Sequence, residues 1–335
     1  MFRFKRLLVT GAAGFIGSNF VRRMLEKHDN VKVVSYDKLT YAGNLTNLDN
    51  LNNKHNHTFI HADINDSEKV KETLINHKID CIVHFAAESH VDNSIVGPTV
   101  FFETNVMGTL SLIESARTVW FDINNWSDKQ CRFHHVSTDE VYGSLALDDA
   151  AFTEESRYQP NSPYSASKAS SDHIVRSYFH TFGLPTTLSN CSNNYGPYQH
   201  QEKLIPTVIK KCLNNERIPV YGNGLNIRDW LYVDDHCDAI EAILTKGIVG
   251  ETYNVGGNCE LDNLSLIKCI CHMMDDLIPQ KKSYMDLMSF VKDRKGHDFR
   301  YAIDNSKIKR ELGWESKQSF IELLSNTVTF YIQKK

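Results

Sequence analysis

Short apolar and β-branched runs alternate with amphipathic stretches along the first half of the chain. We expect strands at Arg6–Thr10, Val31–Tyr36, Thr58–His61, Cys81–Phe85 and Arg132–Val136, with later ones at Thr186–Leu188 and Glu251–Val255. Helical patterns at Phe15–Lys27 and around Thr104–Val119 separate some of these runs. The alternation predicts an α/β fold with a doubly wound parallel sheet, which binds ligands at the carboxyl ends of its strands.

The pattern becomes less regular after residue 190. Helices are expected at Leu204–Leu213 and Asp234–Leu244, separated by loops rich in Asn, Gly and Pro. We therefore predict a first domain over residues 1–190 and a second, smaller α/β domain over residues 191–335. Segments late in the chain are expected to return to the first sheet.

Composition narrows the class of protein. The chain has 335 residues, 41% hydrophobic and 23% charged, as is ordinary for a soluble globular enzyme. A net charge of -4 does not indicate nucleic-acid binding, and no apolar run is long enough for a membrane span or a secretory signal. The eight cysteines form no C-x-x-C pair, so we expect reduced thiols, a cytoplasmic location and no metal site.

A glycine-rich loop follows the first strand. In the segment TGAAGFIG, Gly11 supplies a tight turn, Gly14 lets the backbone approach a pyrophosphate, and Gly17 lets the next helix pack on the sheet. The triplet alone also fits a simple turn. Asp37 favours a Rossmann-type NAD site, because a carboxylate after the second strand binds ribose hydroxyls and repels the 2′-phosphate of NADP. The adjacent Lys38 weakens that discrimination slightly.

Asp63, after the third strand, has two interpretations. It either meets the adenine amino group or caps a helix that starts at Asn65.

Tyr164 and Lys168 are four residues apart in a helical pattern. This spacing places both on one face, within reach of one ligand. A nearby ammonium stabilises a phenolate and lowers the tyrosine pKa, so the pair can remove a hydroxyl proton while hydride leaves the same carbon. Lys168 can also bind the nicotinamide ribose. Alone, the motif also fits a solvated helix face; after a nucleotide loop the catalytic interpretation is favoured.

The fifth strand runs into Thr138, Asp139 and Glu140. Thr138 can hydrogen-bond the reacting oxygen, although the segment also fits a polar exit from a strand. Neighbours in a strand point to opposite faces, so both carboxylates reach one substrate only if the chain bends after Thr138. Two carboxyl groups in different protonation states suit an elimination. Once a sugar C4 is a ketone, a base removes the C5 proton and an acid protonates the leaving C6 hydroxyl.

These motifs resemble the dTDP-glucose 4,6-dehydratases, a family of extended short-chain dehydrogenases/reductases. The likeness runs over the whole chain and is carried by TGAAGFIGS (10–18), YDKLTYAGNL (36–45), HFAAESHVDNS (84–94), HHVSTDEVYG (134–143), SPYSASKASSDH (162–173), NCSNNYGPY (190–198), EKLIP (202–206), RDWLYVDDH (228–236), DRKGHD (293–298) and RYAID (300–304). It implies tightly bound NAD, regenerated in each turnover, and the substrate dTDP-glucose. It also implies the product dTDP-4-keto-6-deoxyglucose, a place in rhamnose biosynthesis and a homodimer.

The resemblance also assigns site residues. It places NAD against Phe15, Ile16, Asp37, Lys38, Leu39, Thr40, Asp63, Ile64, Phe85, Ala86, Ala87, Glu88, Ser89, Thr104, Tyr164, Lys168 and Asn194. It makes Tyr164 the oxidation base, Asp139 the elimination acid and Glu140 the elimination base. It places the sugar against Ser89, Thr138 and Asn193. It places the nucleotide diphosphate against Lys203, Leu204, Pro219, Val220, Tyr221, Arg228, Asn263, Arg294 and His297.

Alternatives remain at this stage. Arg228 could instead pair with Asp229 or Asp234, and the Arg294–His297 loop could simply face solvent. The helices around Thr104–Val119 and Ser165–Phe179 carry apolar stripes. These stripes could pair with a second copy across a homodimer interface, or they could pack only within one chain.

The sequence departs from the family pattern at Asn93, Lys295 and His200–Gln201. Lys295 and His200–Gln201 lie near the expected nucleotide site. A UDP-glucose 4,6-dehydratase is therefore a close alternative. A nucleotide-sugar 4-epimerase or decarboxylase does not need the Asp139–Glu140 pair, and an NAD-binding sensor needs no catalytic residues.

Overall fold

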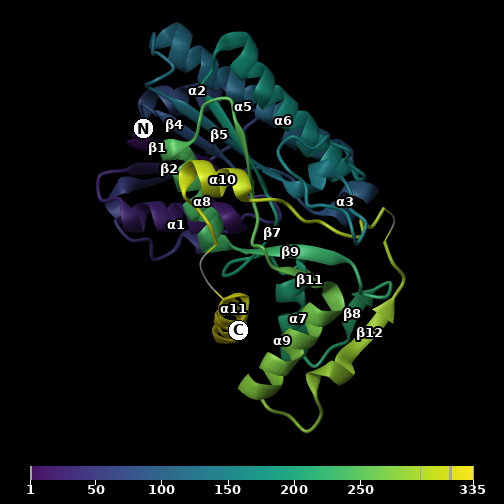
Figure 1. Cartoon of the computed structure of the whole chain (residues 1–335). Coiled ribbons are helices and arrows are strands. Elements are labelled where there is room, and N and C mark those ends of the chain that lie inside the picture. The colour runs from purple at the N-terminus through teal and green to yellow at the C-terminus, as the bar shows by residue number, and fades with distance from the viewer. Residues whose placement is uncertain (1, 295, 317–318, 335) are drawn as a thin grey trace.

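A computed structural model of the chain describes residues 2–294, 296–316 and 319–334. Its centre is a parallel seven-stranded sheet in the order β10-β6-β5-β4-β1-β2-β3 (Figure 1). The strands are β1 (Arg6–Thr10), β2 (Lys32–Asp37), β3 (His57–His61), β4 (Cys81–His84), β5 (Arg132–Thr138), β6 (Thr186–Cys191) and β10 (Thr252–Val255). The predicted doubly wound sheet is confirmed, with strand ends shifted by up to three residues. The strand order reverses between β1 and β4, which is where such sheets bind ligands.

Alternate residues of the strands face two different helix layers. Leu7 and Val9 pack with one cluster and Leu8 with the other, because successive side chains point to opposite faces. The first layer consists of α1 (Phe15–Lys27), α8 (Val233–Lys246) and α10 (Ser306–Leu312). The second consists of α2 (Ser67–Asn76), α5 (Gly108–Arg117) and α6 (Pro163–Phe182). The sheet is therefore buried on both faces.

Helix α6, which carries Tyr164 and Lys168, has clear sequence signals at both ends. Ser162 accepts a hydrogen bond from the Ser165 amide in a capping box, and Pro163 occupies the first turn. The helix ends at Gly183, whose φ of +67° favours glycine. These local signals fix where the two catalytic candidates lie along the helix.

The helix predicted at Thr104–Val119 is part of a longer, interrupted one. It comprises α4 (Thr99–Phe101), the π-helical η3 (Phe102–Met107), α5 and the π-helical η4 (Thr118–Ile123), and it follows α3 (Val91–Val96). A Cβ on Gly108 would lie 2.5 Å from Ile64 Cδ1. The helix thus approaches the loop after β3 closely.

A second group of elements lies beyond the carboxyl ends of the sheet (Figure 1). Its strands are β7 (Asn193–Tyr195), β8 (Ile218–Tyr221), β9 (Ile227–Tyr232), β11 (Glu260–Asp262) and β12 (Met288–Val291). They form a β11-β9-β7 sheet and a β12-β8 pair. Its helices α7 (Leu204–Leu213), α9 (Asn263–Leu277) and α11 (Phe320–Gln333) enclose a separate core. Short 3₁₀ helices occur at η1 (Leu45–Leu48), η2 (Lys54–Asn56), η5 (Asp139–Tyr142) and η6 (Tyr284–Leu287).

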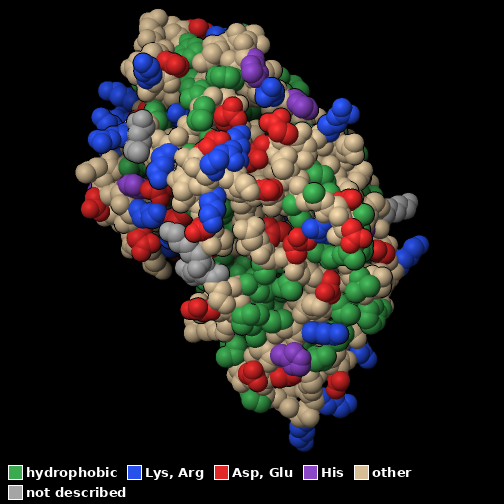
Figure 2. Space-filling model, in the orientation of Figure 1, with side chains coloured by type: hydrophobic (Ala, Val, Ile, Leu, Met, Phe, Trp, Pro, Cys, Tyr) green, Lys and Arg blue, Asp and Glu red, His purple; other side chains and the backbone are tan. Residues whose placement is uncertain are grey.

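The surface carries charges of both signs. On the face in Figure 2, acidic and basic side chains are interspersed, and hydrophobic side chains gather toward the part that holds α7 and α9. None of the described helices combines the length and apolar character needed to cross a bilayer.

Candidate active site

The loop after β1 forms the floor of a cavity at the carboxyl ends of the strands. Gly11 has a φ of +67°, and a Cβ there would lie 2.7 Å from the Ala86 amide nitrogen. A Cβ on Gly17 would lie 2.2 Å from the Gly11 carbonyl oxygen. Gly11, Gly14 and Gly17 all line the cavity. The glycines therefore keep the backbone close to whatever the cavity binds.

Two acidic side chains from neighbouring strands lie at the same cavity. Asp37 accepts hydrogen bonds from the amides of Ala13 (2.9 Å) and Leu39 (2.8 Å). Asp63 accepts from the Asn65 amide and pairs with Lys38 Nζ at 2.6 Å. It is not a helix N-cap, because α2 begins at Ser67 and Asp66 caps it. The structure places Asp37, Lys38 and Asp63 on the wall of this cavity.

The chain bends where β5 ends, as the carboxylate pair requires. Thr138 is the last residue of β5, and its hydroxyl accepts a hydrogen bond from the Glu140 amide (3.3 Å) to start η5. The short helix replaces the alternation of a strand, so Thr138, Asp139 and Glu140 all line the cavity.

The two carboxyl groups lie in different electrostatic surroundings. Asp139 is 1% exposed, and burial raises its pKa well above the usual value, with the charge of Glu140 adding to the effect. Burial also raises the pKa of Glu140, but Arg228, Lys203 and Arg294 oppose that rise. Asp139 is therefore the better proton donor and Glu140 the better base. Among the described residues, the buried Asp139 Oδ2 has no hydrogen-bond partner.

Tyr164 and Lys168 line the same cavity from α6. The Lys168 ammonium donates to the Val136 carbonyl oxygen at 2.8 Å. The expected lowering of the tyrosine pKa is not found: burial raises the pKa of Tyr164, and the charge of Glu140 adds to that rise. Thr138 opposes it through a hydrogen bond to the phenol. In the site without ligands, burial is therefore the main influence against the phenolate, and the charge of Glu140 is the next.

A second cavity adjoins the first and is rich in cations. Arg228 is 5% exposed and donates to the carbonyl oxygens of Ile227 (2.7 Å), Asp298 (3.0 Å) and Phe299 (3.3 Å), with its guanidinium 4.2 Å from the Tyr301 ring centre. No carboxylate in the described part of the chain forms an ion pair with it. The expected alternatives Asp229 and Asp234 are engaged elsewhere, Asp229 with the amides of Gly257 and Cys259 and Asp234 near Arg23. Arg228 is therefore a buried cation that an anionic ligand would neutralise.

Other cationic and polar groups share this second cavity. Lys203 donates to the Ser89 carbonyl oxygen at 2.9 Å, and Arg294 lies 3.5 Å from Asp92. The side chain of His297 is 4% exposed, so it does not simply face solvent. Its Nδ1 lies 2.7 Å from Asp293, whereas no described group bonds to its Nε2.

Most predicted site residues lie on one of the two cavity walls. The first cavity is lined by the five catalytic candidates, Thr138, Asp139, Glu140, Tyr164 and Lys168, and by Phe15, Ile16, Thr40, Ile64, Phe85, Ala86, Ala87, Glu88, Ser89, Thr104, Asn193 and Asn194. The second is lined by Leu204, Pro219, Tyr221, Arg228, Asn263, Arg294 and His297, with Ser89, Glu140, Asn193, Asn194 and Lys203 common to both.

Two residues that the resemblance assigns to the site lie outside both cavity linings. Val220 is 1% exposed and packs into the core of the second unit, because alternate residues of β8 point away from the cavity that Pro219 and Tyr221 line. Leu39 does not line either cavity and packs against the α1 layer.

Several lining residues escaped prediction. They include Tyr36, Gly43, Ala62, Val136, Ser137, Cys191, Ser192, Gln199, His200 and Glu202 in the first cavity, and His90, Asp92, Ser162, Thr207, Trp230, Asp298 and Tyr301 in the second. Position at the end of a strand is a usable signal for Tyr36, and position directly after a strand is one for Ala62 and Ser192. The others come from loops and helices that only the tertiary fold brings together. His200 and the Asn93 site lie in the described residues, whereas Lys295 lies outside them.

Comparisons with known proteins agree with this geometry. Residues 8–327 match the family described as GDP-mannose 4,6 dehydratase. A dTDP-glucose 4,6-dehydratase of Shigella flexneri is 50% identical over 98% of this chain and 92% of its own. One from Xanthomonas campestris is 52% identical over 97% and 92%. The chain belongs to the dTDP-glucose 4,6-dehydratase family.

Solved structures extend the comparison to the fold. DesIV, a dTDP-glucose 4,6-dehydratase of Streptomyces venezuelae with NAD and dTDP bound, has a TM-score of 0.88 and 45% identity, covering 98% of this chain and 97% of its own. A UDP-glucose 4-epimerase of Thermotoga maritima reaches a TM-score of 0.85 at 27% identity over 98% and 99%. The family thus shares its architecture with epimerases.

Proposed function

We propose that this protein converts dTDP-glucose to dTDP-4-keto-6-deoxyglucose, as an NAD-dependent hydro-lyase. The observation that carries the proposal is the bend after Thr138, which brings Asp139 and Glu140, two carboxyl groups in different electrostatic surroundings, to the cavity that Tyr164 and Lys168 line. Epimerisation at C4 has no use for that acid and base pair, whereas loss of water across C5 and C6 needs both.

The first cavity suits NAD. The glycine loop leaves room for a pyrophosphate beside the amino end of α1, where free amides and the helix dipole favour phosphate. Asp37 offers carboxylate oxygens for ribose hydroxyls and disfavours a 2′-phosphate. NAD bound here would supply the hydride chemistry between C4 and C6. Phe85 to Ser89, Thr104, Lys168 and Asn194 would hold its nicotinamide half.

Tyr164 serves the oxidation. Its phenolate takes the C4 hydroxyl proton while Thr138 hydrogen-bonds the same region. The ammonium of Lys168 stabilises the phenolate as it forms.

Glu140 and Asp139 then act in sequence on the ketone. Glu140 removes the C5 proton, which the C4 carbonyl has made acidic. Asp139 donates a proton to the leaving C6 hydroxyl, so water departs and a C5–C6 double bond remains. Hydride addition at C6 and protonation at C5 complete the 6-deoxy product.

The second cavity would hold the nucleotide diphosphate. Lys203, Arg228 and Arg294 supply cations for two phosphates, and His297 Nε2 is free to hydrogen-bond one of them. Leu204, Pro219, Tyr221 and Asn263 line the remaining wall. Asn193 and Ser89 border both cavities, where the sugar must bridge nucleotide and cofactor.

We also propose a homodimer in the cytoplasm. Val96, Val100, Phe102 and Met107 are large apolar side chains left exposed on α3, α4 and η3, beside α6. A second copy of this surface would cover them. The eight cysteines all carry free thiols, as suits a reducing compartment.

The direct test is turnover of dTDP-glucose and UDP-glucose by the purified protein, followed by the alkaline absorbance of the 4-keto-6-deoxy product. We expect turnover of dTDP-glucose without added NAD. A strong preference for UDP-glucose would retain the mechanism and change the nucleotide. Interconversion of C4 epimers without a 6-deoxy product would contradict the proposal.

A further inference from the structure

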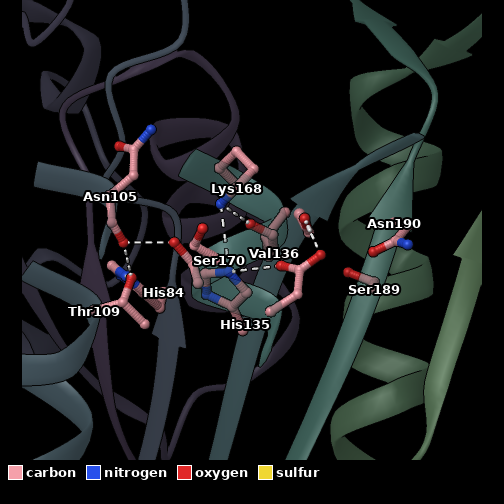
Figure 3. Close-up of polar contacts among 12 residues, drawn as sticks. His84, Asn105, Thr109, His135, Val136, Lys168, Ser170, Ser189 and Asn190 are labelled. Atoms are coloured by element: carbon pink, nitrogen blue, oxygen red, sulfur yellow. Dashed lines mark hydrogen bonds and ion pairs between the residues drawn. The ribbon is translucent and has the colours of Figure 1, made fainter. Parts of the chain in front are cut away.

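Lys168 is an almost fully buried cation at the wall of the first cavity. It is 4% exposed, and its recorded bonds are to the Val136 carbonyl oxygen at 2.8 Å and, at 3.4 Å, His135 Nε2 (Figure 3). A buried ammonium is costly unless an anion balances it. The catalytic role proposed for Lys168 therefore raises the question of which group supplies that balance.

Asp172 is an acidic residue on the same helix as Lys168. It lies four residues after Lys168 and eight after Tyr164, so the three share one face of α6. Asp172 is 3% exposed, and Ser137 Oγ donates to its Oδ2 at 2.8 Å. Burial raises the pKa of Asp172 to about 6, although Lys168 opposes the rise, so this carboxylate is ionised at neutral pH.

His135 lies between the anion and the cation. Its Nε2 is 3.2 Å from Asp172 Oδ1 and 3.4 Å from Lys168 Nζ. Burial, with Lys168, lowers the pKa of His135 well below its usual value, so the ring is neutral. A neutral ring cannot donate to Asp172 and accept from Lys168 through the same nitrogen. Because an ammonium can only donate, Nε2 accepts from Lys168, the ring proton lies on Nδ1, and the ammonium keeps one further N–H group for cofactor or phenol. Asp172 Oδ1 has no hydrogen-bond partner among the described residues and acts beside the ring through its charge.

We propose that Asp172 and His135 are positioning residues for Lys168: the carboxylate is its buried counter-charge, and the neutral ring fixes the direction of the ammonium. The inference rests on the proposed function for the role of Lys168. Asp172 lies behind the cavity and does not line it, so it acts only through its neighbours.

Other titratable groups surround this cluster and bear on its pH dependence. They are Tyr164 and His173 on α6, His134 on β5, His84 on β4, Cys191 on β6, Tyr142 on η5 and Tyr158 before α6. Burial lowers the pKa of His84 and His134 and raises that of Cys191, Tyr142 and Tyr158. All five stay neutral near pH 7, which leaves Asp172 and Lys168 as the charged pair.

The test is Asp172→Asn, which keeps the shape and removes the charge. Loss of the anion lowers the pKa of Lys168, so the ammonium is lost at lower pH than in the wild type. The alkaline limb of the turnover profile should therefore move down by about one pH unit or more. Exchange of bound NAD against labelled NAD should accelerate over the same pH range, a readout that needs no substrate.

Further variants separate charge from structure. Asp172→Glu should restore part of the wild-type alkaline limb. His135→Gln keeps a donor and an acceptor and should lie near the wild type, whereas His135→Leu should speed NAD exchange. Ser170→Ala is a matched control on the same helix, because within the described residues the Ser170 hydroxyl donates to the Ala166 carbonyl oxygen alone.

The outcomes are distinct. An unshifted alkaline limb and unchanged NAD exchange in a folded Asp172→Asn protein would overturn the inference. So would a uniform loss of activity at every pH, since that indicates a structural role alone. If the wild type fails to turn over dTDP-glucose, the proposed function fails, but the NAD exchange of these variants still decides the positioning role.

Discussion

Asp139 and Glu140 are neighbours in sequence, yet the fold gives them different chemistry. Asp139 is closed off from solvent beside another carboxylate, whereas Glu140 faces three cations of the second cavity. Each environment shifts the carboxyl pKa through burial first, and the surrounding charge then separates the two groups. Substrate binding would place the leaving hydroxyl and the C5 proton between an acid and a base.

Glu140→Gln is expected to reduce formation of the 4-keto-6-deoxy product by about 10²-fold to 10⁴-fold, because an amide cannot remove the C5 proton. Oxidation at C4 should persist, since Tyr164 and Lys168 are unchanged. The absorbance of reduced cofactor in a single turnover measures the first step, and the alkaline absorbance of the product measures the second. Wild-type product formation in this variant would rule out Glu140 as the base. Glu155→Gln, on an exposed side chain, is the control.

At the scale of elements, the entry into α1 decides whether the cofactor cavity exists. Gly17→Ala is expected to destabilise the protein by about 1–3 kcal/mol and to weaken NAD binding, because a Cβ would overlap the Gly11 carbonyl oxygen. Gly97→Ala is the matched control, since its Cβ would meet no atom closer than 4.0 Å. Thermal unfolding and NAD titration measure both effects. Equal behaviour of the two variants would contradict the close approach.

Helices α1 and α8 are joined by charges as well as by apolar packing. Arg23 contacts Asp238 through two hydrogen bonds, and Lys27 Nζ lies 2.8 Å from the same carboxylate. Burial raises the pKa of Asp238, but these hydrogen bonds outweigh it and hold the pKa below its usual value.

Asp238→Asn is therefore expected to lower the free energy of unfolding by up to about 1 kcal/mol at neutral pH, given the partial exposure of the pair. Because the folded pKa is depressed, this contribution is complete above about pH 4 and disappears as the pH falls through the folded pKa. Urea unfolding of both proteins at several pH values measures the difference. A gap that persists in strong acid would assign the effect to packing instead. Glu26→Gln, exposed on α1, is the control.

At the scale of the whole molecule, the apolar surface on α3, α4 and η3 is the feature that a single chain leaves unexplained. Val96 is 90% exposed there. Val96→Glu is expected to shift the protein from dimer to monomer in light scattering after size exclusion, because a charge would be buried at the contact. Ile321→Glu, on α11 and also exposed, should leave the mass unchanged. A wild-type protein that is already monomeric would contradict the proposed dimer.

Sequence signals located most of the site because they are local. The glycine loop, the Tyr164–Lys168 spacing and the positions after strands each depend on a few neighbouring residues, and all of them line the cavity as predicted. The side chain of Val220 points into the core, because the side of β8 that faces the cavity depends on register, which one short strand does not reveal. From the sequence, Arg228 could have paired with a neighbouring carboxylate. The fold shows instead that its guanidinium donates to backbone carbonyl oxygens and lies over the ring of Tyr301.

The sequence by itself determined the layered α/β fold, the nucleotide loop and the identity of the reacting groups, because periodicity and motif spacing act over short stretches of chain. Tertiary structure decided which groups share a cavity, how the Asp139 and Glu140 carboxyls differ, and that Asp172 and His135 stand behind Lys168. Those properties depend on burial and on charges brought together from distant segments. Local patterns do not encode them, since desolvation and Coulomb interaction act through space and not along the chain.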